Sequence, residues 1–226
     1  MGSIPEANQL GYVAKATRYA RDVVESTIPA CSLVKAACRR QLEDLDRQTD
    51  PDYPYIFDIK RAEDPCWLIE QLKHIKGAKA GKNLILEPWQ YFILTTVFGW
   101  VYKEDMVDET GVTIARAGKR RFRKVYIEVP KGNGKSPLSA GVAIYMLCAD
   151  GELGAEVYSA ATNRDQAKYV FEPAQQMARR CLPLRERFGV VVNAHDIQVP
   201  DTASWFRTFS SDANSAEGAN PSLHRR

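Results

Sequence analysis

The chain has 226 residues, of which 45% are hydrophobic and 26% are charged, and its formal net charge is +3. These proportions are those of an ordinary globular protein, and they exclude a collagen-like or disordered chain. The length is enough for one domain with its own core and an attached smaller region. The mild positive charge is compatible with a nucleic-acid partner, but dedicated nucleic-acid-binding domains are usually far more basic.

Several features argue against a membrane or secreted protein. The longest apolar stretches, residues 91–102 and 137–149, are shorter than the roughly 20 residues that span a bilayer. The N-terminus has no cationic start followed by an apolar run, so we expect no signal peptide. The five cysteines are scattered and lack metal-ligand spacing, which indicates reduced thiols in a cytoplasm.

The first half of the chain predicts helices. Apolar residues recur at helical spacing in four segments, near residues 11–25, 31–47, 65–75 and 88–102. Prolines interrupt the pattern within residues 49–55, and a glycine-rich loop follows at 76–82. We therefore predict a small helical N-terminal region over residues 1–84 and a second domain over residues 85–226.

A basic run follows an expected hairpin or exposed excursion at residues 103–118. The run covers Lys119–Lys124 and contains five cationic side chains around Phe122. It fits an edge strand whose charges are solvated. It also fits a surface that contacts a phosphate backbone without reading its sequence. The sequence leaves both interpretations open.

Strands and helices alternate in the second half, which is typical of a parallel α/β sheet. A capping pair, Asn163 and Gln166, marks the start of one helix, and Pro173 is expected to kink it. Helices are predicted over residues 136–149 and from 163 to about 181. Strands are predicted at residues 125–129, 156–160, 190–192, 197–199 and 205–209.

The turn between residues 129 and 136 carries the chemistry. It follows the strand at 125–129 and contains Gly132, Gly134, Lys135 and Ser136 just before a helix. Glycines let the backbone approach a phosphate chain closely, and a helix N-terminus adds a favourable dipole. The lysine suits the β- and γ-phosphates, and the serine hydroxyl suits Mg²⁺. The pattern predicts a phosphate loop for ATP.

The match to the usual phosphate-loop spacing is incomplete. The pattern G-x-x-x-x-G-K-[ST] requires its first glycine at position 129, where this chain has Val129. A polar turn before a helix, with an exposed Lys135 and Ser136, is the alternative interpretation of the segment taken alone.

This deviant loop resembles that of the large terminase subunits of tailed bacteriophages, which often lacks the first glycine. The family places a basic residue shortly after the strand, and Lys131 stands at that point. The segment Leu86–Gln90 looks like the family's adenine-recognition segment, with Gln90 as the base-reading residue. Ala160–Ala167 looks like the motif after the phosphate loop. The segments Phe209–Ala213 and Gly218–Ser222 resemble the approach to the catalytic carboxylates, with Asp212 within the first.

The resemblance implies a fold, a site and partners. The implied fold is an α/β P-loop NTPase-type parallel sheet flanked by helices, after a small helical region. The implied cofactors are ATP and Mg²⁺, with Lys135 and Lys131 catalytic and Ser136 on the metal. The implied nucleotide-binding residues are Gln90, Lys131, Gly132, Asn133, Gly134, Lys135 and Ser136. The implied partners are double-stranded phage DNA, a portal protein and a small terminase subunit, in a ring of identical subunits in the bacterial cytoplasm.

The family's hydrolytic carboxylates and nuclease have no counterpart in the sequence. No apolar strand followed by Asp-Glu appears after the loop, and the chain reads Leu223–Arg226 where that strand is expected. One interpretation is a truncated or split gene product with an incomplete central sheet and marginal stability. Another is an accessory piece that completes its site with a second chain. A small-molecule kinase, a DNA-binding module that uses the basic run, and an inert remnant remain as alternative functions.

Overall fold

The structure is a computed structural model that describes residues 11–161, 164–210 and 221–223. The chain forms two compact units, and each is built from two separate stretches of sequence. Unit 1 is Met1–Trp67 with Leu86–Ile127, and unit 2 is Leu68–Ile85 with Glu128–Arg226. These units divide the chain differently from the predicted functional boundary after residue 84, which stays a prediction.

Unit 1 is built from helices and two small antiparallel sheets. Its elements are α1 (Tyr12–Val24), α2 (Ser32–Arg47), the first part of α3 (Ile59–Gln71), α4 (Pro88–Gly99), β1 (Tyr55–Phe57), β2 (Trp100–Tyr102), β3 (Met106–Val107) and β4 (Thr113–Ala115). Strand β1 pairs with β2, and β3 pairs with β4 in the hairpin that the sequence indicated. The predicted helices at residues 11–25 and 31–47 are confirmed. Helix α3 begins at Ile59, before the predicted start, with Pro65 inside it.

The core of unit 1 surrounds Trp100, which is fully buried against Tyr53, Phe57 and Ala62. The indole N–H of Trp100 donates a hydrogen bond of 2.7 Å to Oε1 of Gln41 in α2. A buried indole needs such a partner, because an unsatisfied donor costs about 1–3 kcal/mol. This core therefore fixes α2 against β2 with both apolar and polar contacts.

Arg121, from the middle of the basic run, belongs to this core. Its guanidinium donates to Oδ2 of Asp44 at 2.6 Å and to the hydroxyl of Tyr53 at 2.7 Å. The guanidinium carbon also lies 4.4 Å from the ring centroid of Tyr55. The prediction of an edge strand with solvated charges is therefore wrong for this residue. The reason is that aromatic rings and a carboxylate gather around the cation and replace water.

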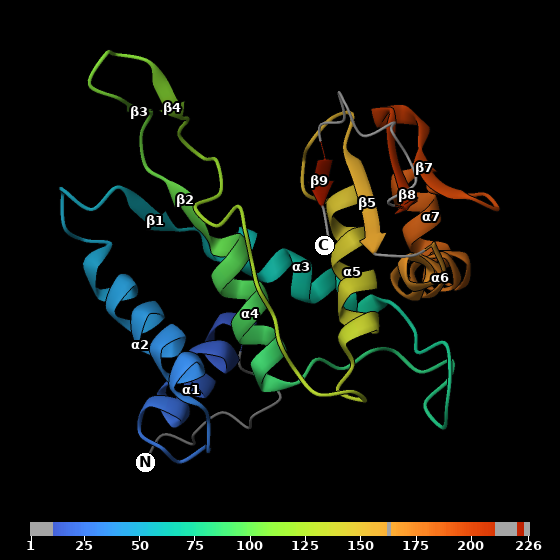
Figure 1. Cartoon of the computed structure of the whole chain (residues 1–226), viewed down its shortest axis with the longest axis horizontal. Helices are drawn as coiled ribbons and strands as arrows, with labels where there is room; N and C mark the ends of the chain where they lie inside the picture. The colour runs from blue at the N-terminus through green and yellow to red at the C-terminus, as the bar shows by residue number, and fades with distance from the viewer. Residues whose placement is uncertain (1–10, 162–163, 211–220, 224–226) are drawn as a thin grey trace, which may run out of the picture. The chain divides into compact units, whose positions relative to one another are not determined.

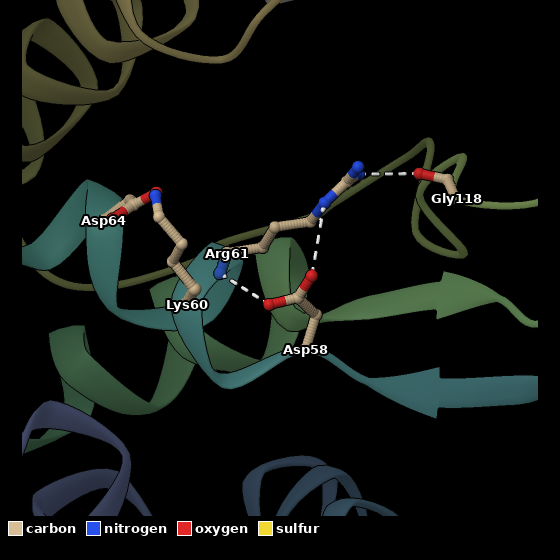
Figure 2. A network of polar contacts seen from close by, with 5 residues as sticks. All are labelled: Asp58, Lys60, Arg61, Asp64 and Gly118. Carbon is tan, nitrogen blue, oxygen red and sulfur yellow. Dashed lines mark hydrogen bonds and ion pairs between the residues drawn. The ribbon is translucent and has the colours of Figure 1, made fainter.

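The start of α3 is fastened to the chain that follows β4. Oδ1 of Asp58 accepts a hydrogen bond of 3.0 Å from the N–H of Arg61, as a helix N-cap does. The guanidinium of Arg61 donates to the carbonyl oxygen of Gly118 at 2.6 Å, as Figure 2 shows. The neighbouring pair Lys60–Asp64 is exposed, and such pairs contribute little to stability.

Unit 2 has a five-stranded sheet beside helices (Figure 1). Its elements are α5 (Lys135–Cys148), β5 (Glu156–Ala161), α6 (Arg164–Arg180), α7 (Leu182–Phe188), β6 (Val191–Val192), β7 (Asp196–Val199), η1 (Pro200–Thr202), β8 (Ser204–Ser210) and β9 (Pro221–Leu223). The strand order is β6-β7-β8-β5-β9. Strand β5 lies parallel to β8 and β9, whereas β6, β7 and β8 pair antiparallel. The fold is therefore mixed α/β.

Helix α6 covers one face of this sheet. Successive residues of β5 alternate in burial, and Val157 and Ser159 point to the covered face. The hydroxyl of Ser159 donates to the carbonyl oxygen of Ala167 in α6 at 2.7 Å. The rings of Phe171 in α6 and Phe206 in β8 meet edge to face, 5.3 Å apart. The predicted strands at residues 156–160 and 205–209 thus form and lie parallel.

The strand predicted at residues 125–129 is wrong within the described structure. Residues 122–130 have neither helical nor strand conformation, and the segment belongs to none of the described sheets. Val125 and Ile127 are 49% and 40% exposed. The β-branched residues favour an extended chain, but a strand also needs a neighbour for its backbone N–H and C=O groups. Local propensity alone therefore did not decide this segment.

Candidate functional site

The turn before α5 has a backbone that can hold an anion. Gly132 and Gly134 have φ angles of +91° and +72°, and Asn133 between them has a negative φ. Only glycine adopts the left-handed region freely, so the two glycines make this alternation possible. Left-handed residues that alternate with right-handed ones can turn successive N–H groups toward one concave side, the arrangement of an anion-binding nest. The side chain of Asn133 closes the turn by donating to the carbonyl oxygen of Pro130 at 3.3 Å.

Lys135 and Ser136 are the first two residues of α5, and Gly134 is its N-cap. No acidic residue lies in the first turn of this helix, so the positive end of the helix dipole is not neutralised there. Both side chains are half-buried. The ammonium of Lys135 donates a short hydrogen bond to the carbonyl oxygen of Val129, at the beginning of the turn. The turn therefore brings the predicted residues 131–136 together around one helix end.

The outer side of the turn is open. Lys131, Gly132 and Asn133 are exposed, and a Cβ placed on Gly132 would meet no atom within 4 Å. Gly132 is therefore required by the positive φ of the turn and not by crowding. The space beside it is open to an approaching group.

A cavity of about 260 Å³ lies beside Ser136. One wall comes from His74 and Lys76 in the loop after α3, and another from Tyr169 and Glu172 in α6. The sequence indicates a glycine-rich loop at residues 76–82 but assigns it no function. Three walls that are distant in sequence build the cavity, so no local motif could indicate it.

The loop that forms this wall is held in place by backbone hydrogen bonds. The N–H of His74 donates to the carbonyl oxygen of Lys82, and the N–H of Leu84 to that of Leu72, both at 2.8 Å. The guanidinium of Arg180 in α6 donates to the carbonyl oxygen of Ile75 at 3.3 Å. The cavity wall is therefore a closed turn fastened to α6.

Gln90, predicted to read a nucleotide base, lies in unit 1 and is 7% exposed. Its Oε1 accepts the N–H of Glu87 at 2.9 Å, and the carboxylate of Glu87 accepts the backbone N–H of Gln90. This reciprocal capping box, with Pro88 as the first helical residue, starts α4. The residues that suggested base recognition thus have a structural role, and base recognition by Gln90 stays a prediction.

Other predicted residues fall partly or wholly outside the described structure. Asn163, Asp212 and residues 218–220 and 224–226 lie outside it. Arg164 and Asp165 are described only as backbone at the start of α6. Among the described residues, no group of three His, Cys, Asp or Glu side chains could hold a metal ion. None of the described helices is long and apolar enough to cross a membrane.

Comparisons with known proteins agree on one family. Residues 88–226 match the family model described as "Terminase large subunit, ATPase domain". The terminase large subunit of Lactococcus phage SK1 is 28% identical over 173 residues, which are 75% of this chain and 30% of that protein. The crystal structure of the HK97 bacteriophage large terminase has a similar fold, with a TM-score of 0.53 at 20% identity over 73% of this chain. The chain spans about 30% of the length of each relative.

Proposed function

Because the chain belongs to the family of terminase large subunits, through their ATPase domain, we propose that residues 129–136 bind the phosphates of ATP. The observation that carries this proposal is the alternating backbone at Gly132 and Gly134, which leads directly into the N-terminus of α5. Such a nest at a helix N-terminus favours phosphate because several N–H donors and the helix dipole act on one anion. The missing glycine at position 129 lies before the turned part of the loop.

Each side chain has a distinct proposed part. The ammonium of Lys135 leaves the carbonyl oxygen of Val129 and bonds the β- and γ-phosphates. The hydroxyl of Ser136 would ligate Mg²⁺, which usually takes only one or two protein ligands together with phosphate oxygens and water. Lys131, exposed at the outer side of the turn, adds a second cation near the terminal phosphate.

We further propose that the chain is part of a motor that uses ATP to move double-stranded DNA into a phage capsid. Large terminase subunits contribute the ATPase to this process, and the proposed partners are DNA, a portal protein, a small terminase subunit and further copies of the same chain in a ring. Support for this role comes from the family match alone.

Calorimetric titration with Mg²⁺–ATP tests the phosphate loop. The unaltered chain should bind, and Lys135→Ala should lose at least tenfold in affinity, because charge-assisted bonds to phosphate are among the stronger ones. Arg185→Ala is the matched control, since it removes one exposed cation from α7 in the same unit. The control should bind as the unaltered chain does.

Equal affinities in the unaltered chain and in Lys135→Ala would refute the assignment of the loop. A purely DNA-binding module would instead bind duplex DNA with a strong salt dependence and show no response to ATP.

A further inference from the structure

The loop after α3, residues 73–82, concentrates positive charge and has no assigned role. Lysines stand at every third position of this lysine-rich loop: Lys73, Lys76, Lys79 and Lys82. No Asp or Glu occurs from residue 71 to residue 86. We infer that the lysine-rich loop contacts the phosphate backbone of duplex DNA. The inference rests on the proposed function for the identity of this partner, and it adds a surface that holds it.

The outer lysines of the loop are available to an anion. Lys76, Lys79 and Lys82 are all exposed. Within the part of the chain that the structure describes, none of the three side chains forms an ion pair or a hydrogen bond. Neighbouring cations repel one another, and a bound polyanion relieves this repulsion while it releases its own counterions. The loop therefore fits a partner that carries many negative charges in a row.

Backbone hydrogen bonds hold the loop in shape. The N–H of His74 donates to the carbonyl oxygen of Lys82 at 2.8 Å, and the N–H of Gly81 donates to that of His74 at 2.9 Å. Gly77 and Gly81 have φ angles of +76° and +85°, and a Cβ on either would meet no atom within 4 Å. A loop that is already ordered loses less conformational entropy on binding than a flexible one. The lysines thus extend from a closed turn with open space around it.

The composition of the loop favours a duplex over a single strand. No Phe, Tyr or Trp occurs from residue 71 to residue 86, whereas single-strand sites usually combine cations with aromatic rings on which bases stack. Small residues separate the outer lysines: Gly77, Ala78, Ala80 and Gly81. They leave room for a bulky backbone to come close. In a duplex the phosphates lie outside the stacked bases, and lysines bind them without reading the sequence.

The position of the loop suits a motor that uses ATP. Lys76 and Ser136 line the same cavity, so the lysine-rich loop lies beside the turn that we propose as the phosphate site. Coupling between two ligands can pass through packed neighbouring elements. A DNA contact at this place is therefore next to the residues whose ligand would change during ATP hydrolysis.

A salt titration tests the contact. Fluorescence anisotropy of a short labelled DNA duplex measures binding by the unaltered chain and by Lys79→Ala/Lys82→Ala between about 50 and 200 mM salt. The loop variant should bind about tenfold more weakly at the lower salt concentration. Its slope of log K against log salt should be shallower by about 2, because two phosphate contacts are lost.

The matched control is Arg18→Ala/Arg21→Ala. It removes two exposed cations, with the same spacing of three residues, from α1. The net charge of the chain falls by the same amount in both variants, so a general loss of positive charge predicts equal effects. A specific contact at the loop predicts an unchanged slope in the control.

Calorimetry with Mg²⁺–ATP on the same proteins separates this inference from the phosphate loop. Lys79→Ala/Lys82→Ala should keep the ATP affinity of the unaltered chain, and Lys135→Ala should keep its duplex affinity in the absence of nucleotide. An unchanged midpoint of urea unfolding shows that the loop variant folds, whatever the result with ATP.

The outcomes distinguish the two proposals. An unchanged slope in the loop variant, an equal loss in the control, or no duplex binding by the unaltered chain at about 50 mM salt would overturn the inference and leave the phosphate loop untouched. The inference also fails if polyglutamate displaces the labelled duplex as well as unlabelled duplex does at equal charge, because the loop is then a general anion surface. A loss of duplex binding confined to the loop variant, with no ATP binding in any protein, would support the DNA contact and refute the phosphate loop.

Discussion

Arg121 in unit 1 and Lys135 in unit 2 are both half-buried cations, but their partners differ. Arg121 bonds the carboxylate of Asp44 and the hydroxyl of Tyr53, among aromatic rings. Among the described residues, Lys135 bonds a backbone carbonyl oxygen alone, and the first turn of its helix contains no acid. Within this part of the chain, the guanidinium of Arg121 has a partner of full opposite charge, whereas the ammonium of Lys135 has a dipole as its partner.

The difference indicates how the two units use positive charge. A cation that is matched by a carboxylate inside the protein stabilises the fold and is not available to a ligand. A cation held by a single carbonyl oxygen keeps most of its attraction for an anion, because dipoles neutralise charge incompletely. The two cations therefore differ in their partners, and only Lys135 remains for the phosphate that we propose as its ligand.

The largest effect is expected from breaking the ion pair between Arg121 and Asp44. Arg121→Met should lower the free energy of unfolding by about 3–5 kcal/mol, because it leaves the carboxylate of Asp44, 5% exposed, without its cation. Hydrogen exchange should rise in α2 and β2, measured peptide by peptide. The double variant Arg121→Met/Asp44→Asn should recover part of the loss. If α2 and β2 of Arg121→Met stay as protected from hydrogen exchange as in the unaltered chain, the ion pair contributes nothing to stability.

A smaller effect is expected from alanine substitutions at two glycines, which distinguish a strained backbone from a loss of ligand binding. Gly132 and Gly151 have φ angles of +91° and +84°, and a Cβ on either would meet no atom within 4 Å. Alanine at either position should cost about 1–2 kcal/mol in unfolding free energy, because an L-residue is strained there. Only Gly132→Ala should also weaken Mg²⁺–ATP in calorimetry, since its methyl group occupies the open side of the turn. Equal ATP affinity in the two variants would contradict the nest.

The smallest effect concerns pH. Burial, followed by its hydrogen bond to Asp44, raises the pKa of Tyr53 from 10.0 to about 12. The folded state thus keeps a proton that the unfolded state releases, so the contribution of Tyr53 is complete below pH 10 and is lost as the pH rises toward 12. In urea titrations, the difference in stability between the unaltered chain and Tyr53→Phe should shrink across this range. A constant difference would show that this hydroxyl has an ordinary pKa.

The helices and the existence of a turn before α5 could be predicted from the sequence because their signals are local, whereas phosphate binding by that turn stays a prediction. The spacing of apolar residues marks α1 and α2, and the order of Gly132, Gly134 and Lys135 marks the turn. Strand β5 is also predicted from the sequence, because residues 156–160 form a short run between two segments with helical patterns.

The parts that could not be predicted depend on partners that are distant in sequence. Residues 125–129 have strand propensity, but no described strand pairs with them in a sheet. In the sequence, Arg121 is only one cation of a basic run. Its carboxylate partner, Asp44, lies far away in the sequence, in α2, so the pairing cannot be recognised from neighbouring residues. The cavity beside Ser136 forms where three segments that are distant in sequence come together, and no pattern of residue spacing predicts such a contact.

The interleaved path of the chain has a consequence for its synthesis. Unit 1 needs the chain as far as residue 127, whereas the described strands of unit 2 include β9, which pairs with β5 and begins only at residue 221. At ribosomal speeds this interval lasts on the order of ten seconds. During that time the stretch Leu68–Ile85 has already emerged and must wait for its own unit. A nascent chain would therefore carry a finished first unit and an exposed, lysine-rich loop that a chaperone could hold.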